Sequence, residues 1–407
     1  MLSSAMDLGY GTQYEAYREE VRAFLSSAWA AAQPRPEKPT PEQVVHFRRA
    51  ATEAGYLYRS IPRQYGGSEQ EPDTLAAQII REEFNAVRAP LELGGHGPQM
   101  LVPTLLEWGT TWQKEHFIRK ALEGEHIWCQ GYSEPGAGSD LAALRTKGEL
   151  RDGEWVLNGQ KIWTTHWRRA QYMFALVRTE PDAGKHAGIS YLLLPMDQPG
   201  VDVRPLKQIT GDSEFAEVFL NDARTPSDWI VGDRGEGWQV SRSLLRHERN
   251  MIGGADRSTG LFQSLLRLAR KARVDGRPAI EDRQVREDLA AIYGYVETQR
   301  YSSYIQLTRD LHGRDAGTLP MLNKLSDTNI RQRVSRLAQR LLGSEVALAP
   351  SGQPAGASSG NEKWMNQFMG SLGMAIAGGT SNIQRNIIAE RGLGLPRDAA
   401  SNREPTP

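Results

Sequence analysis

The chain has little cysteine, no excess of one charge and no long apolar run. Its single cysteine, Cys129, excludes an internal disulfide and a cysteine-rich metal site. The 49 Lys and Arg residues balance 49 Asp and Glu residues, which disfavours general binding to nucleic acid or anionic membranes. The strongest apolar stretches, such as Tyr191–Leu194, are too short to cross a bilayer, and residues 1–7 do not resemble a secretion signal. We expect a cytoplasmic protein with no metal, no nucleic-acid partner and no membrane partner.

Hydrophobic patterning divides the 407 residues into three zones. The first has helical spacing, and one of its helices is predicted to begin after Thr40–Pro41, a capping residue followed by proline. The second contains short β-rich segments, and Asn158–Gly159 predicts a hairpin turn between two of them. The third returns to long helical stretches. The sequence therefore predicts an α+β fold with a helical domain at 1–126, a β-domain at 127–231 and a second helical domain at 232–407.

Two segments of the predicted β-domain have residues suited to a ligand. Tyr132–Asp140 reads Tyr-Ser-Glu-Pro-Gly-Ala-Gly-Ser-Asp, where glycines permit tight backbone conformations and serines supply hydroxyls. Lys161–Thr165 ends with Trp163 and Thr165 on one face of a strand, which suits a heteroaromatic cofactor. An ordinary glycine-rich turn and a half-buried tryptophan are the simpler interpretations of each segment alone.

Two helical segments of the third zone are also candidates. Glu248 lies beside an apolar stripe, where desolvation raises a carboxylate pKa and makes the group a better base near neutral pH. A structural ion pair with Arg249 is the alternative. In Gly378–Arg385, two glycines precede a Thr-Ser pair suited to helix capping, so that exposed N–H groups favour a carbonyl or anionic oxygen. A plain loop between helices fits that segment equally well.

Together these segments resemble the acyl-CoA dehydrogenase family of flavoproteins. The similarity runs from the first helix to Leu395. It rests on the order and spacing of Tyr132–Asp140, Asn158–Thr165, Gly232–Gly237, Glu248–Arg249 and Gly379–Arg391. The resemblance implies an amino-terminal helical domain, a central flavin-facing β-domain and a carboxy-terminal four-helix bundle, normally in a tetramer. FAD is expected between the β-domain and the helical domain, lined by Gln130, Tyr132, Ser133, Trp163, Thr164, Thr165, Thr380 and Asn382.

The resemblance also implies a reaction, the FAD-dependent α,β-dehydrogenation of an acyl-CoA thioester. Many members have a glutamate base where this chain has Gly378, whereas other branches place the base on the bundle helix just before an arginine, where Glu248 stands. Glu248 is therefore predicted to remove the α-proton. Ser139 and Arg249 match positions that face the acyl-CoA, and the Gly378 N–H is expected to bind the thioester carbonyl.

Two departures from the family pattern concern assembly. The usual Arg-x-x-Phe-Gly segment followed by Gln is altered at Arg273–Gln284, and the usual Gln-x-x-Gly-Gly stretch is altered at Arg340–Ser344. Both normally serve a flavin bound mainly by another subunit. The chain is expected in a homotetramer or in a heterotetramer with a paralogous subunit, with electron-transferring flavoprotein as the electron acceptor.

The glycine at 378 leaves space near the α-carbon, which favours a bulky, branched or long acyl group. The sequence also resembles bacterial members of the family associated with the breakdown of steroid side chains or related bulky acyl-CoAs. Two alternatives stay open: a catalytically silent partner subunit, and a flavin monooxygenase or oxidase of the same fold. The basic run Arg267–Arg277 is interpreted as a solvated helix face and loop rather than a DNA site.

Overall fold

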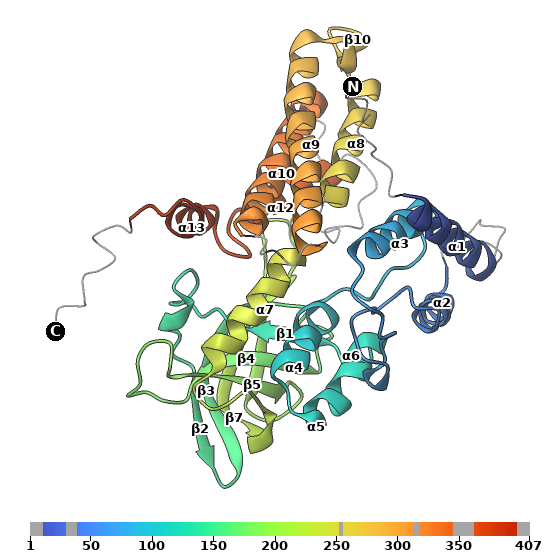
Figure 1. Ribbon diagram of the computed structural model, residues 1–407. Coiled ribbons are helices and arrows are strands. Elements are labelled where there is room, and N and C mark those ends of the chain that lie inside the picture. The colour runs from blue at the N-terminus through green and yellow to red at the C-terminus, as the bar shows by residue number, and fades with distance from the viewer. Residues whose placement is uncertain are drawn as a thin grey trace.

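A computed structural model describes residues 11–29, 39–251, 255–311, 314, 317–344 and 362–396 (Figure 1). Within these ranges, the side chains of 245–256, 307, 310, 311 and 362 lie outside the description. Helices form the amino-terminal part, a sheet follows, and a second group of helices stands above that sheet in the view of Figure 1. No helix among the described residues is long and apolar enough to cross a membrane.

The amino-terminal helices follow the predicted pattern with one interruption. Thr40 caps its helix as expected: its hydroxyl accepts the Gln43 N–H at 3.2 Å, and the Gln43 side chain accepts the Thr40 N–H at 2.9 Å. The long helix expected over 101–122 is broken at Gly109. The helices are α1 (Thr12–Ala28), α2 (Pro41–Glu53), α3 (Thr74–Ala86), α4 (Val102–Trp108), α5 (Thr111–Gln113) and α6 (Arg119–Glu123), with a π-helical turn, η3 (Gly97–Leu101), before α4.

The β-domain is one 8-stranded sheet in the order β6-β7-β3-β2-β4-β5-β8, with β1 paired to β4. The β1–β4 and β2–β4 pairs are parallel, and the other pairs are antiparallel. The strands are β1 (Trp128–Gly131), β2 (Lys147–Arg151), β3 (Glu154–Thr165), β4 (Tyr172–Arg178), β5 (Ile189–Pro195), β6 (Val201–Leu206), β7 (Phe215–Pro226) and β8 (Ile230–Val231).

The hairpin predicted at Asn158–Gly159 is wrong. Both residues lie inside β3, and the chain reverses instead at Asp152–Gly153, where both residues have positive φ. Asn158 instead joins β3 to β7 across a bulge. Its side-chain amide donates to the Asp222 carboxylate and accepts the Asp222 backbone N–H, both at 2.9 Å. A Cβ on Gly159 would lie 2.5 Å from the Thr146 hydroxyl, so close packing requires this glycine.

Strands β4 and β5 are buried on both faces. In β4, Met173, Ala175 and Val177 belong to one apolar core, whereas Phe174 and Leu176 belong to another that continues into the amino-terminal helices. This alternation is what the period of two of a strand produces when both faces are covered. The centre of the sheet is therefore packed between two apolar cores, one on each face.

The bundle consists of α8 (Ala255–Lys271), α9 (Arg283–Leu311), α10 (Leu319–Leu342) and α12 (Glu362–Met374), with a short hairpin of β9 (Arg273–Val274) and β10 (Arg277–Pro278) after α8. Helix α7 (Gly237–Met251) runs from the sheet to the bundle, and α13 (Ser381–Ile387) projects to one side (Figure 1). Residues 252–254, within the expected helix 236–272, lie outside the described residues, as do 345–347 and the loop 350–361.

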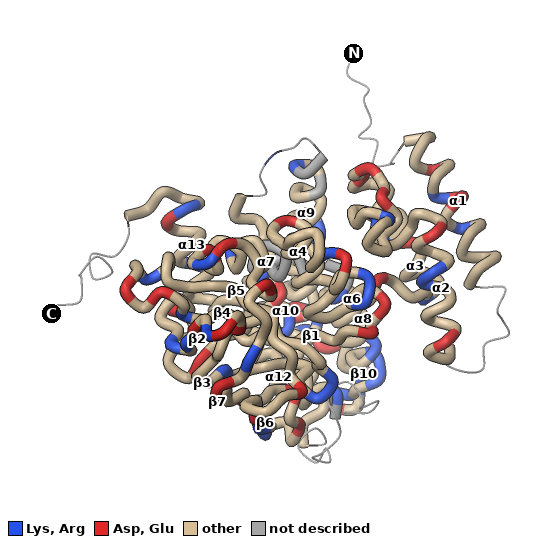
Figure 2. Tube along the Cα trace, turned by 90° about the horizontal axis from the view of Figure 1, so that it is seen from below, with Lys and Arg blue, Asp and Glu red and all other residues tan. Residues whose placement is uncertain are grey.

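Charges of both signs are mixed along the chain (Figure 2). Lys and Arg gather near β10, where Arg267, Arg270, Lys271, Arg273 and Arg277 are all exposed. These residues form the solvated helix face and loop that the sequence predicted.

Candidate functional site

The Tyr132–Asp140 segment leaves the sheet directly after β1. It opens with a tight turn in which Glu134 and Ala137 exchange two backbone hydrogen bonds of 3.0 Å. Gly136 and Gly138 both have negative φ, so a strained backbone is not the reason for these glycines. A Cβ built on either would meet nothing within 4 Å. The segment therefore leaves open space into which a ligand can approach the backbone closely.

Trp163 lies at an irregularity near the end of β3. The register against β7 shifts between Lys161 and Thr164. Lys161 pairs with Val218 and Thr164 with Ala216, so β3 contains one extra residue here. Trp163 has a φ of 63°, a conformation that few residues other than glycine adopt. Trp163 is 58% exposed, and the Phe215 ring packs edge-on against its ring with the centroids 5.9 Å apart. An exposed aromatic face of this size can stack against a flat ligand.

The Tyr132–Asp140 segment and the end of β3 meet at a junction, which is formed by one backbone hydrogen bond. The Ile162 N–H donates to the Ser133 carbonyl at 2.9 Å, which brings Ser133 close to Trp163, and the half-buried Thr165 follows at the end of β3. Thr164 is fully buried, and its hydroxyl has no hydrogen-bond partner in the described part of the chain. Its contact with a flavin stays a prediction.

The other predicted residues of the β-domain are placed on either side of this junction. Gln130 lies in β1 opposite Phe174 of β4. Tyr132 is buried, with its ring edge-on to Phe174 at 6.0 Å. Ser139 is exposed at the far end of its segment. The structure thus groups the β-domain residues along β1, the segment after it, and the end of β3.

A buried ion pair lies beneath the junction. The Lys161 ammonium is 2.8 Å from a carboxylate oxygen of Glu134. Burial lowers the pKa of Lys161 to about 8, although Glu134 opposes the shift. Burial also opposes ionisation of Glu134, but Lys161 and hydrogen-bond donors at Arg145 and Thr146 hold the Glu134 pKa below its ordinary value. The pair is therefore charged at neutral pH.

Two histidines meet beside the same junction. His166 follows Thr165, and its ring centroid is 5.1 Å from that of His96, which comes from the loop before η3. Burial, and secondarily the charge of His166, lowers the pKa of His96 to about 4, so His96 is neutral at physiological pH. Its Nδ1 atom is buried with no hydrogen-bond partner in the described residues. The sequence analysis missed this pair because the two histidines are far apart in the chain and share no motif.

Helix α7 connects the sheet to the bundle and contains Glu248 and Arg249. It packs against β4, β5, η3, α4 and α10, so it contacts all three parts of the molecule. The side chains of Glu248 and Arg249 lie outside the described residues. Their roles therefore stay predictions.

The carboxy-terminal loop is held by α10 and by α13. The buried Lys324 of α10 donates to the Met374 carbonyl at the end of α12, at 3.0 Å. Gly378 and Gly379 have φ of 62° and 85°, and the buried Gln384 side chain donates to the Gly378 carbonyl at 3.0 Å. Thr380 caps α13 through the Ile383 N–H, as the sequence predicted, and Asn382 is exposed in the first turn.

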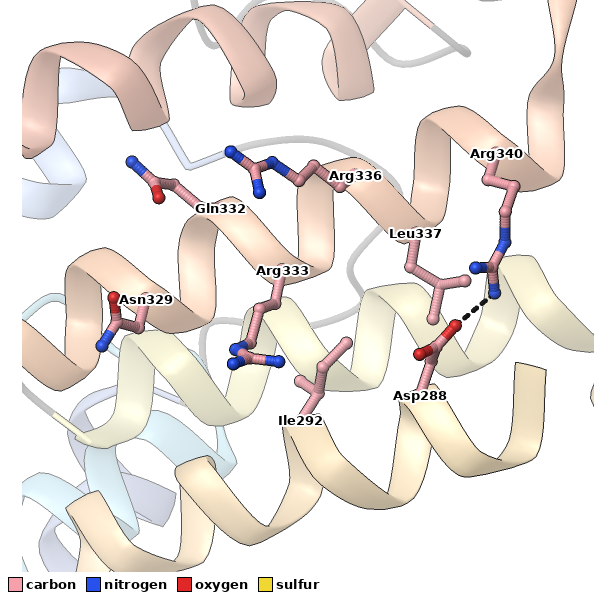
Figure 3. A pocket seen from close by; sticks show the side chains of 8 residues that line it. All are labelled: Asp288, Ile292, Asn329, Gln332, Arg333, Arg336, Leu337 and Arg340. Atoms are coloured by element: carbon pink, nitrogen blue, oxygen red, sulfur yellow. Dashed lines mark hydrogen bonds and ion pairs between the residues drawn. The ribbon is translucent and has the colours of Figure 1, made fainter. Parts of the chain in front are cut away.

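A polar groove of about 520 Å³ lies in the bundle between α9 and α10. Arg340 reaches across it to form an ion pair with Asp288 (Figure 3). The Arg333 guanidinium lies 4.7 Å from the centre of the Tyr295 ring. The groove is lined by Asp288, Ile292, Asn329, Gln332, Arg333, Arg336, Leu337 and Arg340.

Comparison with known families accounts for nearly the whole chain. The amino-terminal, middle and carboxy-terminal domain models of acyl-CoA dehydrogenase match residues 12–125, 129–223 and 235–393. The chain belongs to the acyl-CoA dehydrogenase family. Members are FAD-dependent oxidoreductases, and the predicted fold class is confirmed.

Similar members of the acyl-CoA dehydrogenase family come from mycobacteria. The acyl-CoA dehydrogenase IpdE1 of Mycobacterium tuberculosis is 35% identical over 395 residues, covering 95% of this chain and 98% of that protein. Its namesake in Mycolicibacterium smegmatis is 39% identical over 333 residues, covering 78% and 80%.

Solved structures of acyl-CoA dehydrogenases share the fold over the full length. The ChsE4-ChsE5 complex from Mycobacterium tuberculosis has a chain with a TM-score of 0.75 and 26% identity, covering 97% of this chain and 100% of that one. The Tcur3481-Tcur3483 steroid ACAD has a TM-score of 0.76 and 27% identity, with the same coverage.

Proposed function

We propose that this acyl-CoA dehydrogenase binds FAD and converts a saturated acyl-CoA thioester into its α,β-unsaturated product. The observation that carries the proposal is the exposed Trp163 ring beside Ser133 and Thr165, in a chain matched by all three family domains. The open space beside Gly136 and Gly138 fits a bound cofactor or substrate. Bound FAD would accept the hydride that leaves the β-carbon.

The flavin would be held by residues from the β-domain and the carboxy-terminal loop: Gln130, Tyr132, Ser133, Trp163, Thr164, Thr165, Thr380 and Asn382. Ser139 and Arg249 would face the acyl-CoA. The exposed ring of Trp163 offers a stacking surface, and Ser133 and Thr165 offer hydroxyls beside it. The predicted domain limits, 1–126, 127–231 and 232–407, are part of the same proposal.

Glu248 would remove the α-proton. In the resemblance that supports this role, the base stands just before an arginine on the bundle helix, and Glu248 has that place on α7. The N–H of Gly378 would stabilise the negative charge that develops on the thioester oxygen, since a fixed backbone donor aimed at such an oxygen lowers the barrier. Gln384 supports the donor by holding the Gly378 carbonyl.

Anaerobic flavin bleaching with a panel of acyl-CoAs tests the proposal. The wild-type chain should lose its flavin absorbance on mixing with a substrate, and Glu248→Gln should bleach at least 100-fold more slowly, as expected when a general base is removed. Glu53→Gln, an exposed glutamate on α2, is the matched control and should behave as wild type. Equal rates for Glu248→Gln and wild type would show that the base is elsewhere.

The proposed acyl group is bulky, branched or long. Gly378 has no side chain near the predicted thioester position, and one structural relative is described as a steroid ACAD. The same panel distinguishes substrates: kcat/KM should be larger for ring-bearing or branched thioesters than for butyryl-CoA. A preference for butyryl-CoA over every bulky thioester would contradict this part of the proposal.

We further propose a heteromeric assembly in which only some subunit interfaces hold FAD. The groove between α9 and α10 contains the Arg340–Asp288 ion pair at the place where the family pattern has Gln-x-x-Gly-Gly (Figure 3). One structural relative is likewise a two-protein complex. Size-exclusion chromatography with flavin stoichiometry tests the idea, since one FAD per chain in a homotetramer would contradict it.

Electron-transferring flavoprotein is the proposed electron acceptor. After anaerobic reduction by an acyl-CoA, stopped-flow mixing should show faster reoxidation by this protein than by O₂. Fast reoxidation by O₂ would favour the oxidase or monooxygenase alternative instead.

A further inference from the structure

One buried ion pair has no part in the proposed chemistry. The Lys161 side chain is 0% exposed and that of Glu134 is 7% exposed. The ammonium uses all three of its donors: one on the Glu134 carboxylate, one on the Leu176 carbonyl at 2.7 Å and one on the Tyr132 carbonyl at 3.3 Å. Fully buried lysines are rare unless paired, and this one is bonded to three different backbone or side-chain groups.

The Glu134 carboxylate is satisfied in the same way. Besides Lys161, it accepts the backbone N–H of Arg145 at 2.6 Å and that of Thr146 at 2.9 Å. The pair therefore joins the segment after β1 to β3, to β4 and to the two residues before β2. No other part of the proposed mechanism requires a charge at this place.

The pair links two predicted flavin-facing segments, 130–133 at the end of β1 and 163–165 at the end of β3. These two flavin-facing pieces do not pair with each other in the sheet. Strand β1 pairs with β4, whereas β3 pairs with β2 and β7. Glu134 directly follows Ser133, and Lys161 comes two residues before Trp163. The irregularity in β3 begins just after Lys161. The separation of the two pieces therefore depends on these side-chain bonds together with the hydrogen bond from Ile162 to Ser133.

We propose that the Lys161–Glu134 pair positions the flavin-facing residues by fixing Ser133 against Trp163 and Thr165. This inference rests on the proposed function. Lys161 and Glu134 are positioning residues because they act through their neighbours and do not touch the flavin. The irregularity that gives Trp163 its positive φ begins just after Lys161, so the pair also anchors β3 where that irregularity starts.

A pair that served stability alone would behave differently in a double variant. Removing one partner leaves a buried charge uncompensated, whereas replacing both with neutral residues of similar size removes that penalty. In Lys161→Met with Glu134→Gln, no buried charge is left. The carbonyls of Tyr132 and Leu176 nevertheless lose their common donor. Stability should therefore recover, while the geometry of the flavin-facing pieces should not.

The test measures FAD affinity and Tm for the chain in its native assembly. We compare wild type, each single variant and the double variant by fluorescence titration of the flavin-free protein. The expected result is a double variant with most of the wild-type Tm but at least tenfold weaker FAD binding and a shifted flavin absorption band. Glu134→Gln alone, which preserves the shape of the side chain, should weaken FAD binding severalfold.

A matched control is Thr179→Val. The hydroxyls of Thr179, directly after β4, and of Ser190 in β5 form a buried 2.6 Å hydrogen bond outside the flavin-facing segments. This variant should lower Tm without changing FAD affinity. Wild-type affinity and spectrum in both Glu134→Gln and the double variant would overturn the inference, as would a wild-type assembly that binds no FAD. Tight FAD binding without acyl-CoA bleaching would instead contradict the proposed function alone.

Discussion

The junction in the β-domain and the carboxy-terminal loop are held by different kinds of interaction. At the junction, a buried lysine is neutralised by a buried carboxylate, and the two groups are bonded to the backbone of β4, of the segment after β1 and of the two residues before β2. At the loop, the buried Lys324 donates to the Met374 carbonyl, and its neighbour Asp327 is engaged by Arg331 at 2.7 Å. Removing one charge of the Lys161–Glu134 pair leaves the other charge buried without a partner, so the interactions at the junction are coupled. At the loop, the bonds of Lys324 and of Asp327 can be removed separately.

The largest effect is expected for Lys161→Met. The Glu134 carboxylate would be left buried without its cation, so the free energy of unfolding should fall by about 3–5 kcal/mol. Urea denaturation measures the loss. Arg224→Ala removes one partner of an exposed ion pair with Glu154 and should cost less than about 1 kcal/mol. Equal costs for the two variants would show that the buried pair has no special role.

Lys324→Met should have a smaller effect than Lys161→Met. It removes a charge-assisted hydrogen bond to Met374, worth about 1.5–3 kcal/mol, but leaves no carboxylate without a partner because Asp327 still binds Arg331. The same urea experiment compares the two lysines directly. If Lys324→Met costs as much as Lys161→Met, the two regions do not differ as described.

Acid should affect the junction through His96. The folded chain holds this histidine neutral with a pKa of about 4, while the unfolded chain takes up its proton near pH 6.5. The free energy of unfolding should therefore decrease as pH falls from 6.5 to 4, with His96 contributing about 2–3 kcal/mol. His96→Gln should remove this part of the pH dependence. His46→Gln, at an exposed histidine on α2, should not change the profile.

The smallest effects on stability are expected for glycine-to-alanine substitutions. One lies in the carboxy-terminal loop and the other in the segment after β1. Gly379→Ala places a Cβ at positive φ and 2.5 Å from the Gln384 amide nitrogen, so it should cost about 1–2 kcal/mol. Gly136→Ala meets nothing within 4 Å and should leave Tm unchanged. It should nevertheless weaken FAD or acyl-CoA binding in titrations, because its methyl group enters the open space. Unchanged affinity would place the ligand elsewhere.

Local sequence signals predicted much of the fold. The strands at Tyr172–Arg178 and Val201–Leu206 coincide with β4 and β6, because short β-rich runs between turn residues admit few alternatives. The cap at Thr40 is also confirmed. In contrast, the turn at Asn158–Gly159 was wrong because tertiary contacts override local preference: Asn158 bonds to Asp222, and Gly159 packs against Thr146.

The sequence predicted less of the candidate site than of the fold. Motifs indicated Ser133 and Trp163, which the structure brings together. They did not indicate that Lys161 pairs with Glu134, since a lysine in a strand is ordinarily expected to be exposed and the two residues share no short spacing. The meeting of His96 and His166 likewise depends on how the loop before η3 packs against the end of β3.

The attachment of β1 and β2 to the same strand has a consequence for how this protein can diversify. Each is paired separately with β4, at Trp128–Gly131 against Tyr172–Ala175 and at Lys147 against Arg178. The intervening stretch, 132–146, therefore leaves one side of β4 and returns to the same side. Insertions or replacements around Gly138 would leave the strand register intact as long as Glu134 stays in place. Ligand preference can thus change by replacement of the exposed residues 138–140, while Ala137, Ala142 and Leu144 keep their places in the core.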